Sequence, residues 1–528
     1  MGTKRFSRQR LLYFFLGVVA LLVVLAVVAL QALESVPALS RVAAALSSAL
    51  GQPVAIGGLS ASIFPTPSIS AQFIRIGGAD SNAAPGVSLA AIHIVPQLGS
   101  LLPGRTLTID HVDLNGLVIS VRRDSAGRWL LPVPPVPTTD TSGGSNGMNL
   151  NQLRARGGSI RVVDELRAPA GGPTVTTITG VEADMQALGG RLKVPRFTGR
   201  LGQSVVTGSA DMGPSGAELR LASESIHPAD VHALFALAGM RASPLLSIEG
   251  KAPVEMTITL PPGFATHSVT GKAAIERVKY GSLAFENLQA PFHLEHGVFT
   301  LDPLTYTTYG GQQQGTVSVD LNQPVAAYTI RTSVQHLDVN RALSANTTMK
   351  DFLAGGGRLA GNVRGSGNTS AALKRTLTGT LAFEVKDGVV RNFPLLAAIN
   401  QALGITQGNE RDTKFQSLSG TATLGGGRAR TNNLVLRAGE LSLKGKGTVG
   451  FDQRLDLRMT ATISPVMSAK LTQRLSLFKR LSNEGGQITF PVTVTGTTMA
   501  PRISVDLGSI AKKQLVEEVD QGLLKLLQ

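Results

Sequence analysis

The chain has 528 residues, with 59 glycines, 27 prolines, no cysteine, and 16% charged against 43% hydrophobic residues. This composition is too apolar for a disordered chain, and the missing cysteine excludes disulfides, thiolate nucleophiles, zinc–thiolate sites and iron–sulfur clusters. The net charge of +15 suggests an anionic neighbour, but aromatic residues make up only 5% and are not interleaved with basic runs, so we expect no nucleic-acid partner.

The first predicted element is a membrane anchor. Residues 11–30 carry no charge, and as a helix they would span about 30 Å, the thickness of a hydrocarbon core. A cleaved signal peptide would have a shorter apolar region and a small-residue cleavage site, so we expect an uncleaved, single-pass anchor. The positive-inside bias predicts a cytoplasmic N-terminus and a translocated remainder. The topology-setting residues are basic and precede the anchor: Lys4, Arg5, Arg8 and Arg10.

Composition and patterning divide the chain into six expected segments. The clearest boundary is a stretch rich in Pro, Gly and Ser, which reads as a linker. The segments are 1–33, the cytoplasmic N-terminus and anchor; 34–131, a helix and a β domain; 132–147, the linker; 148–375, central β-rich repeats; 376–508, a C-terminal β region; and 509–528, an amphipathic helix.

Most of the chain after the anchor alternates apolar and polar residues with a period of two. This pattern predicts antiparallel strands with one apolar and one wet face. Weak self-similarity supports a repeated unit of about 50 residues, because 285–288, Gly297 and 315–317 match 415–418, Gly427 and 447–449. A third, eroded copy runs from Ile178 through Gly190 to Gly208. Few helices are expected, at 35–50, 228–240, 340–353, 393–403, 466–481 and 509–527.

So few helices cannot cover so much apolar sheet, and a large apolar face must be buried or bind something. Either the sheet closes on itself as a sandwich, or it curls into an elongated, taco-like groove whose floor takes an apolar ligand. Aliphatic residues with few aromatics suit flexible acyl chains. The candidate lipid-facing residues are Leu441, Leu443, Leu455, Leu457, Met459, Ile488, Phe490, Val492 and Val494.

Motifs for chemistry are weak. Residues 445–450 fit GxGxxG, but they lie in a strand pattern and open no helix, and 143–147 fit GxSxG within the linker. His293 and His296 flank Glu295, yet positions i and i+3 of a strand face opposite ways. We therefore expect a non-enzymatic protein with no catalytic residue, cofactor or metal. The basic amphipathic segment 466–481 fits either a membrane surface or a lid over one end of the sheet.

Several ordered motifs follow the anchor. They include QPVAI at 52–56, GRTLTIDHVDLNG at 104–116 and SVRRDSAGR at 120–128, and near the other end FQSLSG at 415–420 and VTGTTMAPR at 494–502. With these motifs the chain resembles the AsmA family, which includes the TamB-like proteins. Segments 34–131 and 376–508 carry the resemblance, and the residues between them are similar to the family in their strand pattern alone.

The resemblance implies an inner-membrane protein of Gram-negative bacteria with a periplasmic β domain and a role in outer-membrane biogenesis. It implies that phospholipid, or another acyl-chain lipid, moves along an apolar β groove, and it carries no catalytic residue. The alternatives are an assembly factor for outer-membrane proteins, which would offer an exposed β edge to its client, and a structural tether. The inner membrane and lipid are the expected partners, with an outer-membrane protein as a further one.

Overall fold

The chain divides into two compact units. Unit 1 comprises Met1–Ser243, Ile248–Ala274 and Phe292–His296, and unit 2 comprises the rest. The computed structural model describes residues 39–40, 43–44, 46–48, 52–62, 66–77, 86–97, 108–130, 149–166, 173–188, 191–213, 215–262, 266–323, 325–347, 349–367, 369–404, 410–474, 482–483 and 485–508.

The expected anchor with its four basic residues, the linker and the C-terminal helix lie outside the described residues. Among the helices that are described, none has the length and apolar character needed to span a membrane. The division between the units falls within the expected central segment, and the other expected boundaries stay predictions.

Unit 1 is a sheet with short helical segments, and the described residues between 39 and 48 are helical, as expected for 35–50. Its elements are β1 (Val54–Ala55), β2 (Gly58–Ser62), β3 (Ser68–Gly77), β4 (Gly86–Pro96), β5 (Thr108–Asn115), β6 (Val118–Arg123), β7 (Trp129–Leu130), β8 (Asn149–Asp164), β9 (Thr174–Leu188), β10 (Arg191–Leu201), β11 (Ser204–Gly213), β12 (Gly216–Ser223), η2 (Pro228–Asp230), α3 (Val231–Leu237) and β14 (Val254–Leu260). Three further strands have residues in both units: β13 (Leu246–Glu249), β15 (Ser268–Tyr280) and β16 (Leu283–Glu295).

The expectation of a purely antiparallel sheet is wrong in unit 1. Strand β8 pairs in parallel with both β5 and β6, so the sheet is mixed. Parallel neighbours need a connection of a dozen residues or more, and residues 131–148 lie between β7 and β8. The composition of this segment marked it as a linker, but nothing in it indicated on which strand the chain would return.

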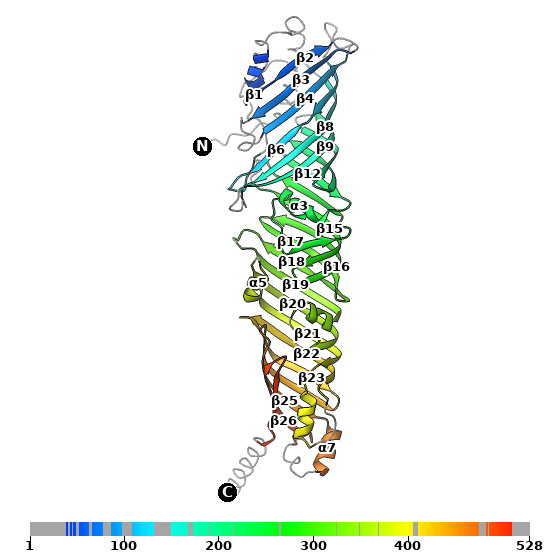
Figure 1. Ribbon diagram of the computed structural model, residues 1–528, viewed down its shortest axis with the longest axis vertical. Coiled ribbons are helices and arrows are strands. Elements are labelled where there is room, and N and C mark those ends of the chain that lie inside the picture. The colour runs from blue at the N-terminus through cyan, green and yellow to red at the C-terminus, as the bar shows by residue number, and fades with distance from the viewer. Residues whose placement is uncertain are drawn as a thin grey trace. The chain divides into compact units, whose positions relative to one another are not determined.

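Unit 2 is an antiparallel meander in which each strand from β17 to β27 pairs with the next one (Figure 1). Its elements are β17 (Val298–Thr308), β18 (Gly311–Asp320), β19 (Ala327–Asp338), α4 (Val339–Asn346), β20 (Leu353–Ser366), α5 (Ser370–Thr376), β21 (Thr378–Val390), α6 (Leu395–Ala402), β22 (Thr413–Gly425), β23 (Arg428–Ala438), β24 (Leu441–Gly450), β25 (Arg454–Ile463), α7 (Pro465–Arg474), β26 (Thr489–Thr497) and β27 (Pro501–Val505).

The fold is mainly β with few short helices, as expected. The helices expected at 228–240 and 393–403 are present, whereas the one expected at 340–353 is shorter and starts at Val339, where Asp338 accepts a hydrogen bond from the backbone N–H of Arg341. Helix α5 was not expected. Its N-cap Thr369 and the basic Lys374 and Arg375 in its last turn are ordinary helix signals that could have predicted it.

The expected repeats correspond to equivalent places in the sheet. Gly297 lies in the turn between β16 and β17, and Gly427 in the turn between β22 and β23. The Gly-Thr-Val segments lie in β18 and β24. The register rows described below place Val317 and Val449 in one row and Gly315 and Gly447 in the next. A repeated sequence thus marks a repeated position on one face of unit 2.

Candidate functional site: an apolar sheet face in unit 2

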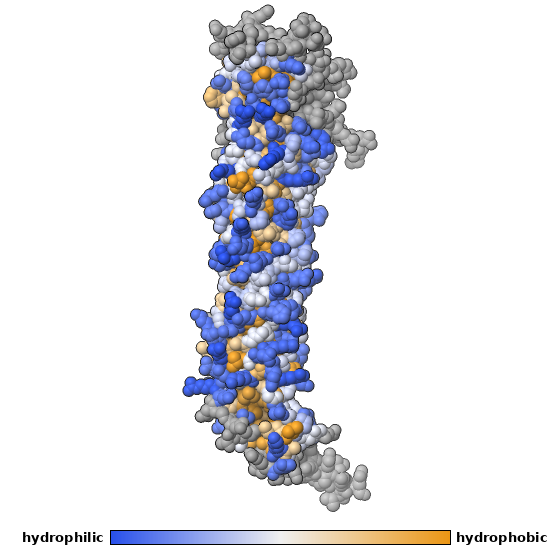
Figure 2. Space-filling model, turned by 90° about the vertical axis from the view of Figure 1, so that its right-hand side faces the viewer, coloured by the Kyte–Doolittle hydropathy of each residue, from blue (hydrophilic) through white to orange (hydrophobic). Residues whose placement is uncertain are grey.

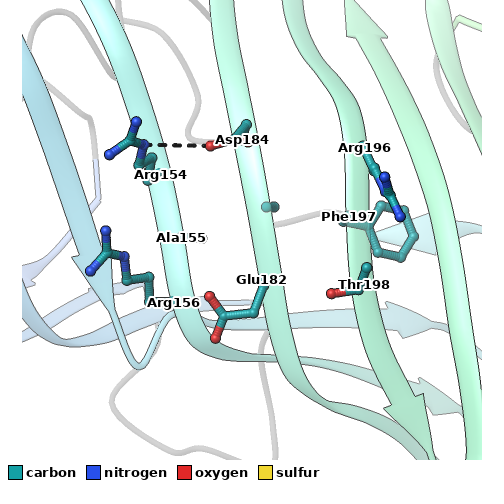
Figure 3. Close-up of a pocket in the computed structure, with 9 residues that line it drawn as sticks. Arg154, Ala155, Arg156, Glu182, Asp184, Arg196, Phe197 and Thr198 are labelled. Carbon is teal, nitrogen blue, oxygen red and sulfur yellow. Dashed lines mark ion pairs between the residues drawn. The ribbon is translucent and has the colours of Figure 1, made fainter.

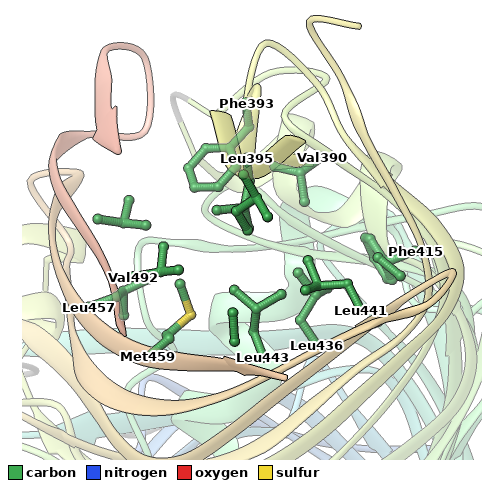
Figure 4. Close-up of a cluster of buried hydrophobic side chains, with 14 of the residues drawn as sticks. Val390, Phe393, Leu395, Phe415, Leu436, Leu441, Leu443, Leu457, Met459 and Val492 are labelled. Atoms are coloured by element: carbon green, nitrogen blue, oxygen red, sulfur yellow. The ribbon is translucent and has the colours of Figure 1, made fainter. Parts of the chain in front are cut away.

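All nine candidate lipid-facing residues lie together in one buried cluster of unit 2, and each is at most 9% exposed. Figure 4 shows strands β22–β26 curving around this cluster, with the labelled apolar side chains pointing toward its centre. We call this cluster the C-terminal core. Its side chains contact one another, so in this structure they form a packed interior.

Helix α6 covers the C-terminal core opposite strands β24 and β25 (Figure 4). Leu395 and Ile399 on this helix are 2% and 1% exposed, and the helix also contacts the last strand, β27. The N-terminal end of α6 lacks a side-chain cap of its own. Instead the buried Thr413 hydroxyl donates to the Phe393 carbonyl at 2.5 Å and accepts from the Leu395 N–H at 3.2 Å. One hydroxyl therefore supplies the cap that the helix lacks.

Helix α7 closes another part of the same core. Leu471 is 5% exposed within the cluster, whereas Lys470 is exposed. Buried Ser468 accepts a hydrogen bond from the Ile488 N–H at 3.0 Å and donates to the Ile463 carbonyl at 3.3 Å, so it ties the end of β25 to the approach to β26. The described part of the amphipathic segment thus packs on the sheet, as in the lid interpretation.

Glycines on the inner face let the sheet curve and large side chains fold over it. A Cβ on Gly445 would lie 2.5 Å from Met459 Cγ and 2.4 Å from the Arg458 carbonyl oxygen. A Cβ on Gly361 would lie 2.5 Å from a methyl carbon of Leu381. Both glycines are opposite these large residues in the strand register. The glycine excess in the sequence therefore has a packing cause here.

The apolar face of the core continues along the meander. In strand register, one row runs through Leu301, Val317, Ile330 and Val363, then Gly379, Leu424, Ala429 and Val449, and ends at Leu455 in the core. A parallel row joins Val334, Leu359 and Phe383. Because directly opposed residues in neighbouring strands share a face, these rows lie on one face of the sheet, which is mainly apolar.

Exposure changes along this surface. Apolar residues of β17–β21 in the rows are mostly only half-buried, while their counterparts in β24–β26 are buried. Helices α4 and α5 contact β20, near Gly357 and Ser366 at its two ends. We call the half-buried surface the open face; its members are Phe299, Leu301, Val317, Val319, Tyr328, Ile330, Leu359, Val363, Leu381 and Phe383.

Tyr306 borders the open face, Tyr328 belongs to it, and both stay protonated over a wide pH range. Burial raises the pKa of Tyr306 to about 12, and the ring packs edge-on against Phe285 at a centroid distance of 4.6 Å. Burial also raises the pKa of Tyr328, with a hydrogen bond to Tyr280 as a second cause. The opposite face of these strands carries residues such as Arg331, Gln314 and Lys386, which are exposed. Figure 2 shows a face of the molecule on which hydrophilic residues predominate and hydrophobic ones lie in separate patches.

Unit 1 has a buried charged cluster that fixes helix α3. Arg123, 7% exposed, donates to the Gly239 carbonyl at 2.8 Å and lies 3.6 Å from Asp164 and 5.6 Å from the centre of the Trp129 ring. His267 hydrogen-bonds the Ala238 carbonyl at 3.1 Å. Burial lowers the pKa of Arg123, and Asp164 opposes that effect. These groups meet the carbonyls of the two residues that follow α3, at its C-terminal end, where positive charge is stabilising.

A shallow hollow of about 390 Å³ lies over β8–β10 in unit 1 (Figure 3). Arg154 and Arg196 both oppose Asp184 in strand register, and Arg154 lies 3.6 Å from its carboxylate. Glu182 accepts a hydrogen bond from the Gly157 N–H at 2.9 Å. The hollow is thus lined mainly by charged residues, with Phe197 as its one large apolar side chain.

The candidate motifs for chemistry keep their ordinary structural roles. Residues 445–450 lie in β24, and His293 is in β16 while His296 follows it at the turn, with a φ of 49°. Within the described ranges no group of three or more His, Asp or Glu side chains could hold a metal ion. Residues 143–147 lie outside those ranges.

Sequence reasoning found the strands that supply the C-terminal core and missed the open face as a distinct surface. Val317, Val319, Tyr328 and Ile330 were recognised as alternating strand residues, but their half-buried state depends on which helices cover the sheet. The scarcity of helices indicated that the helices cannot cover the whole apolar face, but no residue pattern showed which strands stay uncovered.

The fold and this surface define a class of protein: a curved β-sheet protein with a continuous apolar face that is only partly covered. Residues 266–434 match the model of the AsmA family, so the expected family is confirmed and the chain carries an AsmA family region there. This match contains β17–β21 and thus the open face, where the sequence showed strand pattern alone. No curated protein and no solved structure matches the chain.

Proposed function

We propose that this chain is a non-enzymatic, membrane-anchored protein that binds the acyl chains of phospholipid on the open face of unit 2. The observation that carries the proposal is the contiguous, half-buried apolar surface of β17–β21 in an otherwise charged sheet. Monomeric soluble proteins rarely leave such a surface without a ligand or partner. The surface then acts as the floor of a groove, with lipid headgroups in water at its rim.

The energetics favour a lipid over a specific polar ligand. Each methylene group that leaves water for an apolar surface gains about 0.8 kcal/mol, so about ten methylenes gain about 8 kcal/mol before the cost of ordering the chain. Aliphatic walls without many fixed polar groups tolerate chains of different length. Neighbouring rows of the same face would allow a chain to shift from strand to strand without breaking hydrogen bonds.

The AsmA family region and the sequence-predicted anchor support a setting for this activity. We place the protein in the inner membrane of a Gram-negative bacterium, with the N-terminus cytoplasmic, the β units periplasmic, and a role in outer-membrane biogenesis. Assembly of outer-membrane proteins at a β edge and a purely structural tether stay predictions from the sequence. The last described strand, β27, pairs with β26 and contacts α6, which gives strand addition no specific support.

The experiment compares two adjacent residues of β19 that face opposite sides of the sheet. Ile330→Asp puts a charge on the open face, and Thr329→Asp puts the same charge on the other face, next to Ser318 and Arg364 in register. The full chain is purified and its bound phospholipid is quantified by mass spectrometry. We expect Ile330→Asp to lose most bound lipid and Thr329→Asp to retain it. Equal lipid in the two variants, or no lipid on the unmodified protein, would refute the proposal.

A further inference from the structure

The open face contains one buried polar side chain that its surroundings do not satisfy. Gln313 of β18 lies two positions from Gly315 and four from Val317, so it shares their face of the sheet, and it is only 5% exposed. Its Nε2 donates to Thr332 Oγ1 at 3.1 Å. Its Oε1 is buried and accepts no hydrogen bond from any described residue. A buried amide oxygen without a donor is costly, so each such atom in a native fold calls for an explanation.

The neighbours of Gln313 are arranged to hold its amide in place. A Cβ on Gly315 would lie 2.8 Å from Gln313 Nε2. The amide therefore lies over the glycine and fits there only because glycine has no side chain. Gly315 is opposite Thr332 in register, and Tyr306 is opposite Gln313. A Cβ at position 315 would also lie 2.1 Å from the Arg331 carbonyl oxygen, which rules out a larger residue there. The amide, the hydroxyl and the glycine thus form a polar position in an apolar row.

The free atom determines the chemistry of the missing partner. An amide oxygen accepts hydrogen bonds, so the partner must bring a donor. Because the surroundings are apolar, they favour a donor group that is attached to an apolar molecule. Tyr306 beside it stays protonated because burial raises its pKa, so the tyrosine is not a competing anion. A hydroxyl or amide N–H close to an acyl chain meets both conditions.

We propose that Gln313 Oε1 is a recognition site for lipids that carry a hydroxyl or amide N–H next to an acyl chain, an inference that rests on acyl-chain binding at the open face. Plain hydrocarbon chains bind the surrounding rows, while a chain with a donor also satisfies the amide. The site therefore sets a preference among lipids and does not create binding by itself.

The test uses a saturated fatty acid and its β-hydroxy derivative of the same chain length. Each competes with a fluorescent acyl probe for the full chain. A single net hydrogen bond predicts a roughly 3- to 10-fold preference of the unmodified protein for the hydroxylated acid. Gln313→Met keeps length and flexibility but lacks the acceptor, and it should abolish the preference while the plain acid binds as before. Gln314→Met, on the exposed face of the same strand, should keep the preference.

The outcomes separate this inference from the proposed function. If neither acid competes, acyl-chain binding itself fails. If both acids compete equally, or if Gln313→Met retains the preference, the open face binds chains but Gln313 does not recognise a donor. Should Gln313→Met fold poorly by thermal unfolding, Gln313→Leu provides the same removal of the acceptor.

Discussion

The open face and the C-terminal core are two parts of one apolar surface in unit 2, built from the same residue types in the same register rows. They differ in what covers them. Helices α6 and α7 and strand β27 pack on the core, and Val339 of α4 joins it, whereas α5 contacts β20 near Ser366. The comparison teaches that the apolar strand pattern marks a surface, and that coverage decides whether the surface is protein interior or binding site. Substitutions should therefore change stability in one part and ligand binding in the other.

The largest expected effect is on stability, from truncation in the C-terminal core. Phe490 is fully buried, so Phe490→Ala should lower the free energy of unfolding of unit 2 by about 3–5 kcal/mol through lost burial and the cavity left behind. Phe299→Ala on the half-buried open face is the matched control and should cost about 1 kcal/mol. The two losses of stability are measured by urea unfolding, with hydrogen exchange in β26 and β17 as the local readout. Equal losses in the two variants would contradict the distinction between the C-terminal core and the open face.

A somewhat smaller loss is expected from a side chain added where the core strands meet. Gly445→Ala places a Cβ against the Arg458 carbonyl oxygen and Met459, which should cost about 1–3 kcal/mol. Gly356→Ala in β20 is the control, because nothing lies within 4 Å of its Cβ position. That control should change stability by no more than about 0.5 kcal/mol. Thermal unfolding of the two variants tests the pair, and a tolerated alanine at 445 would contradict the close packing described for β24 and β25.

The next effect concerns the helix that covers the core. Thr413→Val keeps the shape but removes the hydroxyl that bridges Phe393 and Leu395. Each backbone group then loses one hydrogen bond and keeps only the direct bond from the Leu395 N–H to the Phe393 carbonyl at 2.8 Å, at a cost of about 1–2 kcal/mol. Hydrogen exchange should rise in α6 while β24 stays protected. Thr413→Ser restores a hydroxyl and should restore protection. Unchanged exchange in Thr413→Val would mean that the apolar contacts of α6 suffice to hold it.

The smallest effect is a pH dependence from the open-face side. The pKa of Tyr306 is about 12 when folded, above its ordinary value of 10, so the folded state holds this proton more tightly. Two pKa units correspond to about 2.7 kcal/mol at most, and solvent screening of the partly exposed ring lowers this to about 1 kcal/mol. This contribution is present below pH 10 and is lost as the pH rises from 10 to 12. Tyr306→Phe should flatten this slope in the pH dependence of unfolding. A slope that persists in the variant would assign it to other groups.

The sequence predicted the strands and their faces well, because alternation is a local property. Leu455, Leu457 and Met459 share the inner face of β25 as their spacing indicates, and Phe490 and Val492 share that of β26. The sequence could not predict which residues stay half-exposed, since that depends on where α6 packs after a turn. Nor could it predict the parallel return of β8 beside β5 and β6, because strand neighbours are a long-range choice.

The structure also changes how the candidate site should be tested. Leu457→Asp and Val492→Asp lie in the packed core, so a charge there should destabilise unit 2 and remove lipid only as a consequence. Ile330 and Val317 lie where a charge can be solvated, which makes them cleaner probes of binding. Whether the nine core residues ever contact lipid stays a prediction.

The most direct test of the central claim is crosslinking of the full chain, in its membrane, to a phospholipid with a photoreactive group at the end of one acyl chain. Mass spectrometry of the digested protein then locates the adducts. Acyl-chain binding on the open face predicts adducts in β17–β21, at residues such as Val317, Ile330 and Val363, and few at Phe490 or Val492. Adducts confined to the C-terminal core or to the charged face of the sheet, or no adducts in the β units, would contradict it.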